Sequence, residues 1–169
     1  MPSLQKRDVP SDPYAELTFR SEKYAGAATE IHLGGRGITR LANFETFLSL
    51  DTLWINNNQL TSLRGLENNF RLQHLFAHQN NIRRIQGTLQ PFKFLSELSL
   101  DGNLLDSTED VLDELSNLKY LRNLNLFGNS IAQEDGYRLR LLADLPWIDV
   151  LDRIKVSSII YALLHKNTR

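Results

Sequence analysis

The chain has 169 residues, of which 41% are hydrophobic and 23% are charged, and its formal net charge is -1. This composition is typical of a globular protein of about one domain, so a wholly disordered chain is excluded. The small net charge gives no basic field for nonspecific binding to nucleic acid or membranes. The absence of cysteine excludes disulfides, thiolate metal sites and cysteine nucleophiles.

Residues 1–16 contain three prolines and mixed charges, and we expect them to form a flexible N-terminal arm. They hold no apolar stretch of the kind that a signal peptide requires, so an intracellular protein is expected. Residues 17–28 are only loosely helical in pattern. We expect them to cover the first end of the domain that follows.

Five copies of one pattern come next, L-x-x-L-x-L-x-x-N-x-L in its full form. The copies begin at residues 28, 50, 72, 95 and 121, so successive starts are 22, 22, 23 and 26 residues apart. Repeats of this length indicate a solenoid, in which each unit buries its apolar side against its neighbours.

Apolar residues within each copy have the period of a strand. Leu53 and Ile55 are two apart, so both are expected to enter a shared core. The asparagine at the ninth position is expected to turn its amide inward and bond to the backbone of the loop that leaves the strand. Stacked copies then give a structural ladder of asparagines: Asn58, Asn80, Asn103 and Asn129. The first copy has Arg36 there, as expected of a terminal repeat.

The fourth repeat is longer because residues 106–121 have the spacing of a full α-helix. Ser107, followed by Asp110 three residues later, predicts a capped start. We expect the acidic side chains of this helix to face water: Glu109, Asp110, Asp113 and Glu114.

Together, the repeats and the segment 132–152 resemble the leucine-rich-repeat superfamily, in particular the 22-residue class typified by the regulatory subunit of protein phosphatase 1. Residues in register with the C-terminal cap of that family are Tyr137, Arg138, Pro146, Trp147, Leu151 and Asp152. The resemblance implies an α/β fold over residues 17–152. The fold would be a right-handed solenoid with a parallel concave β-sheet and 3₁₀ or short α-helices on the convex side.

Residues 153–169 form a basic tail with four cations and no acidic residue. Apolar residues recur in it at helical spacing, which predicts an amphipathic helix. The helix is expected to fold back on the cap, to dock on a partner, or to bind a membrane or an acidic surface. The residues that would dock are Ile159, Ile160, Leu163 and Leu164.

The concave face is the candidate functional surface. Trp54 lies between Leu53 and Ile55, so strand alternation turns its ring out of the core. Strands about 4.8 Å apart would place it beside Phe76. Aromatic anchors ringed by polar groups are typical of protein interfaces. We predict a partner-binding surface made of His32, Trp54, Asn56, His74, Phe76, His78, Glu97, Asp101, Asn125 and Phe127. Alternatively, the rings pair only with each other or lie under the N-terminal arm.

No pattern in the sequence predicts catalysis, a cofactor or a metal site. Histidines side by side on one sheet face rarely converge on a metal. The run Gly34 to Gly37 lacks the lysine of a phosphate loop. We therefore expect no catalytic residues, no cofactor and no metal.

The expected function is that of a non-enzymatic scaffold that binds a polypeptide on its concave face. In its small size, repeat class and cap, the chain resembles the axonemal leucine-rich-repeat proteins. This resemblance implies that it is a subunit of a larger ciliary or flagellar complex in the cytoplasm. One alternative is a ribonucleoprotein subunit similar to the leucine-rich component of the U2 splicing particle, which implies the nucleus. A further alternative is a phosphatase regulatory adaptor. No membrane and no sequence-specific nucleic acid is expected as a partner.

Overall fold

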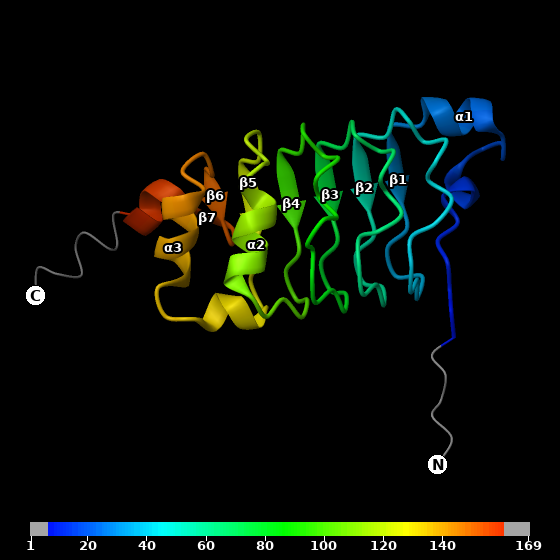
Figure 1. Cartoon of the computed structure of the whole chain (residues 1–169). Helices are drawn as coiled ribbons and strands as arrows, with labels where there is room; N and C mark the ends of the chain where they lie inside the picture. The colour runs from blue at the N-terminus through cyan, green and yellow to red at the C-terminus, as the bar shows by residue number, and fades with distance from the viewer. Residues whose placement is uncertain (1–6, 161–169) are drawn as a thin grey trace, which may run out of the picture.

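A computed structural model describes residues 7–160 (Figure 1). The strands are β1 (Glu30–His32), β2 (Thr52–Trp54), β3 (His74–Phe76), β4 (Glu97–Ser99), β5 (Asn123–Asn125), β6 (Val150–Leu151) and β7 (Ile154–Lys155). The helices are α1 (Glu22–Ala27), α2 (Thr108–Leu115) and α3 (Tyr137–Asp144), with 3₁₀ turns at Pro13–Glu16 and Ser130–Gln133.

The strands form one sheet in chain order, from β1 to β7. Pairing is parallel from β1 to β6, and only the last pair, β6 with β7, is antiparallel. Figure 1 shows the strands side by side like rungs, with the first and last described residues at opposite ends. The predicted leucine-rich-repeat solenoid with a parallel sheet is therefore confirmed.

The core is a continuous apolar interior between the sheet and the loops behind it. Each strand from β1 to β5 contributes its middle residue and the residue that directly follows the strand. In the second repeat these are Leu53 and Ile55, and both are fully buried. Burying such a side chain contributes about 2 kcal/mol. Because every repeat supplies the same two positions, the interior runs unbroken from Ile31 in β1 to Leu151 in β6.

Each asparagine of the ladder connects two neighbouring repeats. Asn103 Oδ1 accepts a hydrogen bond from the backbone N–H of Ile82, at 3.0 Å. Its Nδ2 donates to the carbonyls of Ala77 at 3.0 Å and Leu100 at 2.9 Å. The same arrangement recurs at Asn58, Asn80 and Asn129. These amides satisfy backbone groups that the apolar interior would otherwise leave unpaired.

The N-terminal segment differs from the expected flexible arm over its described part. The backbone N–H of Ser11 donates to the carbonyl of Arg40 at 3.0 Å, and that of Thr39 donates to Val9 at 2.8 Å. Ser11 Oγ donates to the carbonyl of Ala42. The chain therefore runs along residues 39–43 and packs beside the first repeat, so it does not lie over the concave rings. Residues 1–6 lie outside the described residues.

Helix α2 also differs from its prediction. It begins as expected, with the N–H of Asp110 donating to Ser107 Oγ at 3.2 Å, but it ends at Leu115 instead of near residue 121. Glu114 does not face water, because it is only 7% exposed. Its carboxylate accepts from the backbone N–H groups of Gly87 and Leu89, both at 2.7 Å. Helical periodicity alone could not reveal the third-repeat loop that covers this residue.

The C-terminal cap is built around the buried carboxylate of Asp152, which directly follows β6. Asp152 Oδ1 accepts from the backbone N–H of Leu126 at 2.9 Å, and the Tyr137 hydroxyl donates to it at 3.5 Å. Arg138 lies 3.5 Å from Oδ2. Burial raises the pKa of the Asp152 carboxyl, although the Leu126 N–H and Arg138 oppose the shift. Leu151 is buried beside it.

Beyond the cap, a short strand precedes the helix that the spacing of the tail predicts. Ile154 and Lys155 pair with β6, and helix follows over residues 156–160. Ile159 is buried in the core cluster, whereas Ile160 is exposed. The first turn of this helix thus packs on the cap. Leu163 and Leu164 lie outside the described residues.

Candidate protein-binding surface

Three rings form a continuous row across β1, β2 and β3, which we call the ring row: His32, Trp54 and Phe76. The strand register pairs His32 with Trp54 and Trp54 with Phe76. The Trp54 and Phe76 ring centroids are 3.8 Å apart with an interplanar angle of 17°. Those of His32 and Trp54 are 5.6 Å apart with an angle of 11°. The parallel register therefore stacks the rings face to face on the concave side.

Glu30 fixes the first part of the ring row. Its Oε1 accepts a hydrogen bond from Trp54 Nε1 at 3.1 Å and lies 3.0 Å from His32 Nε2. The sequence analysis did not include Glu30 in the candidate site. Its position two residues before His32 on the same strand face was the available signal.

The other two histidines do not join His32 in one cluster. His74 Nδ1 lies 3.3 Å from Glu97 Oε2, one strand further along the sheet. His78 lies beyond the end of β3, and its buried Nδ1 has no hydrogen-bond partner among the described residues. Within residues 7–160, no three histidine or carboxylate side chains are grouped as metal ligands would be.

The C-terminal half of the concave face is polar where the N-terminal half is aromatic. Asp101 accepts from Ser99 Oγ at 2.5 Å and from the Arg153 guanidinium at 3.1 Å. Arg153 was missed by the sequence analysis because it reaches the concave face only through the tight turn between β6 and β7. A hollow of about 260 Å³ extends from Phe76 to Arg153 and includes Asn125.

The remaining predicted residues lie at the margins of this face. Phe127 is 63% exposed, beyond the end of β5, so it does not join the ring row. Asn56 packs over Gly34, where an added Cβ would come within 3.0 Å of Asn56 Oδ1. In the cap, Trp147 is partly buried beneath the ammonium group of Lys119, which lies 3.7 Å from the ring centroid, and Pro146 beside it is exposed.

The family model described as "Leucine-rich repeat" matches residues 13–159. The chain belongs to the leucine-rich-repeat family. Leucine-rich repeat-containing protein 51 of Bos taurus is 37% identical over 111 residues, which are 60% of this chain and 56% of that protein. U2 small nuclear ribonucleoprotein A′ of Homo sapiens is 33% identical over 147 residues, 85% of this chain and 57% of that protein. This leucine-rich-repeat chain thus spans little more than half the length of either relative.

Solved structures give the same fold. A chain of the Drosophila melanogaster SNF/U2A′ complex matches with a TM-score of 0.71 and 27% identity, covering 83% of this chain and 81% of that one. An internalin from Listeria monocytogenes matches with a TM-score of 0.60 and 23% identity, covering 78% of this chain and 37% of that one, and this likeness is one of fold alone. No helix within residues 7–160 is long and apolar enough to cross a membrane.

Proposed function

We propose that this leucine-rich-repeat protein is a non-enzymatic scaffold that holds a polypeptide on its concave face. The observation that carries the proposal is the ring row, because three aromatic side chains lie on the open side of a sheet whose other side is the core. Aromatic anchors of this kind dominate the energy of protein interfaces. The sheet is rigid before binding, so little conformational entropy is lost on association.

The polar groups around the rings fit the same role. Asn56 and Asn125 can donate and accept hydrogen bonds, while Glu97 adds negative charge beyond Phe76. A polar rim around an apolar centre gives an interface its register and its selectivity. A partner segment that presents an apolar side chain to the rings and a cation to Glu97 would complement this face.

Among the candidate complexes, we favour a ribonucleoprotein. The similarity to U2 small nuclear ribonucleoprotein A′ extends over 85% of this chain, and the SNF/U2A′ structure holds a relative of this chain in a complex with a second protein. We therefore propose a partner of the SNF type and a nuclear location. The axonemal and phosphatase-adaptor roles rest on resemblance in repeat class and cap, to which the relatives named above add nothing.

The test is isothermal titration calorimetry of the purified chain with Drosophila SNF, beside affinity capture from cell lysate. Wild type is compared with the Trp54→Ala, Phe76→Ala double variant, whose fold is verified by circular dichroism. Loss of two ring anchors weakens an interface by about 2 kcal/mol or more, or at least about thirtyfold in Kd. An Arg64→Ala variant, altered at an exposed residue between β2 and β3, serves as the matched control.

The outcomes separate the two levels of the proposal. Binding of SNF that the double variant loses supports both the concave site and the ribonucleoprotein class. A different captured protein that the double variant loses supports the scaffold and rejects the SNF-type partner. Equal binding by both forms rejects the concave site.

A further inference from the structure

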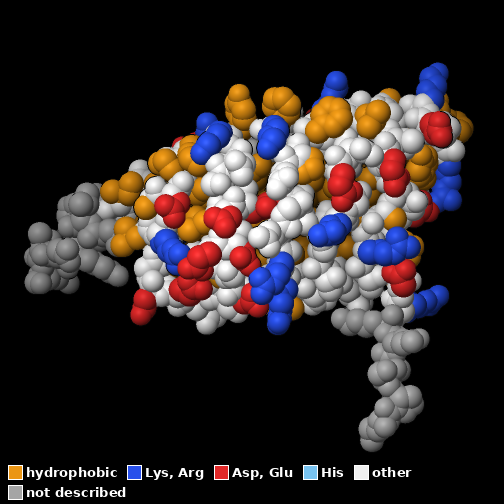
Figure 2. Space-filling model, in the orientation of Figure 1, with side chains coloured by type: hydrophobic (Ala, Val, Ile, Leu, Met, Phe, Trp, Pro, Cys, Tyr) orange, Lys and Arg blue, Asp and Glu red, His pale blue; other side chains and the backbone are white. Residues whose placement is uncertain are grey.

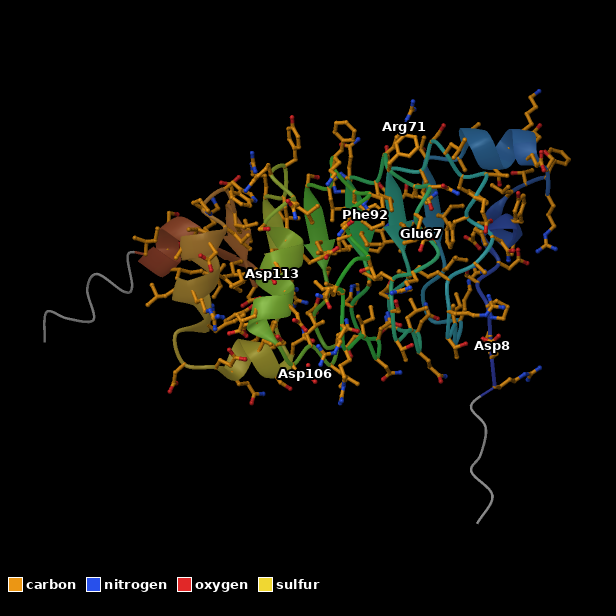
Figure 3. The ribbon with its side chains drawn as sticks, viewed as in Figure 1. Asp8, Glu67, Arg71, Phe92, Asp106 and Asp113 are labelled. Atoms are coloured by element: carbon orange, nitrogen blue, oxygen red, sulfur yellow. The ribbon has the colours of Figure 1, made fainter. Side chains whose placement is uncertain are left out.

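A second surface lies along the edge of the solenoid where the strands begin. Its aromatic members are Phe94, which is 55% exposed, and Tyr120, which is 60% exposed. Their ring centroids are 6.2 Å apart. Figure 2 shows hydrophobic side chains and Lys or Arg side chains gathered along this edge, and Figure 3 shows Arg71 rising from it. We call this the strand-entry rim and define it as Arg71, Lys93, Phe94, Lys119, Tyr120 and Arg122.

Repeat register explains why these residues line up. Arg71, Phe94 and Tyr120 each stand directly before the first leucine of a repeat, and parallel strands about 4.8 Å apart bring such positions together. The leucines that follow them are fully buried and fill the core. The exposed rings are therefore not needed to close the interior, and neighbouring exposed aromatic side chains mark an interaction surface.

The rim borders a hollow of about 760 Å³. Its lining combines the two rings with polar and basic side chains, among them Phe94, Tyr120, Gln73, Ser96, Arg71 and Arg122. None of the residues that line this hollow lines the concave hollow near Arg153. The two surfaces can therefore be altered independently.

The rim is basic although the whole chain has a net charge of -1. Within residues 7–160, no acidic side chain forms an ion pair with Arg71, Lys93 or Lys119. Arg122 lies 3.9 Å from the exposed carboxylate of Asp149, and it donates to the backbone carbonyls of Lys119 and Leu121. Although the Lys119 ammonium lies over Trp147, a ligand with negative charge and apolar side chains would meet Arg71 and Lys93 beside the exposed rings.

We propose that the strand-entry rim is a second docking site, which takes an extended acidic peptide segment of a protein partner with large apolar side chains. Leucine or phenylalanine side chains of the peptide lie against Phe94 and Tyr120, and its carboxylates face Arg71 and Arg122. A peptide fits better than a nucleic acid because Asp51 also lines the hollow. A peptide can place an uncharged residue beside Asp51 and its carboxylates beside the cations, whereas every nucleotide carries a phosphate. The protein would then join two polypeptides, one at each surface.

The experiment uses a fluorescein-labelled dodecapeptide in which glutamate alternates with leucine and phenylalanine. Binding is measured by fluorescence anisotropy at low and high salt and mapped by ¹⁵N–¹H correlation spectra of the full chain. We expect the largest shifts at the amides of residues 71–73, 93–96 and 119–122, and weaker binding at high salt. Phe94→Ser with Tyr120→Ser, and separately Arg71→Glu with Lys93→Glu, should each raise Kd at least about tenfold. Trp54→Ala should leave Kd unchanged.

Three results would overturn the proposal. The first is an absence of rim shifts, or a Kd that neither rim variant changes while circular dichroism shows both to be folded. The second is a labelled oligouridylate that shifts the same amides and binds more tightly than the peptide, which would make the rim a nucleic-acid site. The third is a dimer of the wild type that the Phe94→Ser, Tyr120→Ser variant loses, which would make it a contact between copies of this chain.

Discussion

The two sides of each short strand follow different rules. On the inner side, the middle strand residue is leucine or isoleucine from β1 to β5 and is buried in all of them. On the outer side, the last strand residue changes from His32 through Trp54 and Phe76 to serine and then asparagine. The inner side is constrained by packing at crystal-like density. The outer side does not pack into the core, so its residues are free to vary, which is what the proposed binding surface requires.

Removal of a ladder amide tests the inner side most severely. Asn103→Ala leaves the N–H of Ile82 and the carbonyls of Ala77 and Leu100 without partners in a dry interior. We expect the free energy of unfolding to fall by about 3–5 kcal/mol, with a Tm lower by about 10 °C. Thermal unfolding followed by circular dichroism measures this. Asn123→Ala, at an exposed asparagine of β5, should change stability by less than about 0.5 kcal/mol, and equal effects at both positions would contradict the ladder.

Two adjacent residues of β3 compare the sides directly. Leu75 is fully buried, so Leu75→Ala should cost about 3 kcal/mol. Phe76 lies on the other side and is partly exposed, so Phe76→Ala should cost about 1 kcal/mol. Urea unfolding of the two variants gives both values. If Phe76→Ala were as costly as Leu75→Ala, the ring row would belong to the structural interior and would not be a binding surface.

Helix α2 sharpens the comparison, because its acidic residues look alike in sequence. Glu114→Gln loses the charge on the group that accepts from Gly87 and Leu89 and turns an NH₂ group toward one of these donors. We expect a loss of about 2 kcal/mol in unfolding free energy. The matched control is Asp113→Asn, which changes an exposed side chain of the same helix and should have almost no effect. Guanidinium titrations of both variants decide whether Glu114 fastens the third-repeat loop.

The smallest expected effect is at Asp152, the buried carboxyl of the C-terminal cap. Its folded-state pKa is raised above the roughly 3.9 of an unfolded aspartate. The group therefore favours folding fully only below about pH 4, and this contribution is lost as the pH rises through the folded pKa. Asp152→Asn should stay within about 1 kcal/mol of wild type, and its stability relative to wild type should increase from pH 3.5 to pH 7. Urea unfolding across this pH range measures the difference in stability between the variant and wild type. A constant or decreasing difference would contradict the raised pKa of Asp152.

Repetition made the solenoid predictable from sequence. Each strand from β1 to β5 occupies the third to fifth residues of its copy of the pattern, as β2 does at Thr52–Trp54 after the start at Leu50. The same alternation placed Trp54 and Phe76 on the concave face. Their separation and the support from Glu30 depend on side-chain rotamers, which a residue pattern does not specify.

Other features are determined by contacts between distant parts of the chain. The pairing of Ser11 with Arg40 joins segments of irregular sequence, so no period could reveal it. The position of Arg153 depends on a two-residue turn in which Asp152 and Arg153 both have positive φ, at 51° and 65°. The burial of Glu114 depends on a loop 25 residues earlier. Each of these is a tertiary relationship that leaves no local signature.

The asparagine ladder also has a mechanical consequence. Each amide bonds only to its own repeat and to the one before it. When the molecule is stretched, force is therefore transmitted between neighbouring repeats only. Loss of the hydrogen bonds of one ladder asparagine leaves those of the others intact, and the chain can unfold from either end one repeat at a time. By the same logic, the molecule can be lengthened or shortened by one complete turn without redesign of the turns that remain.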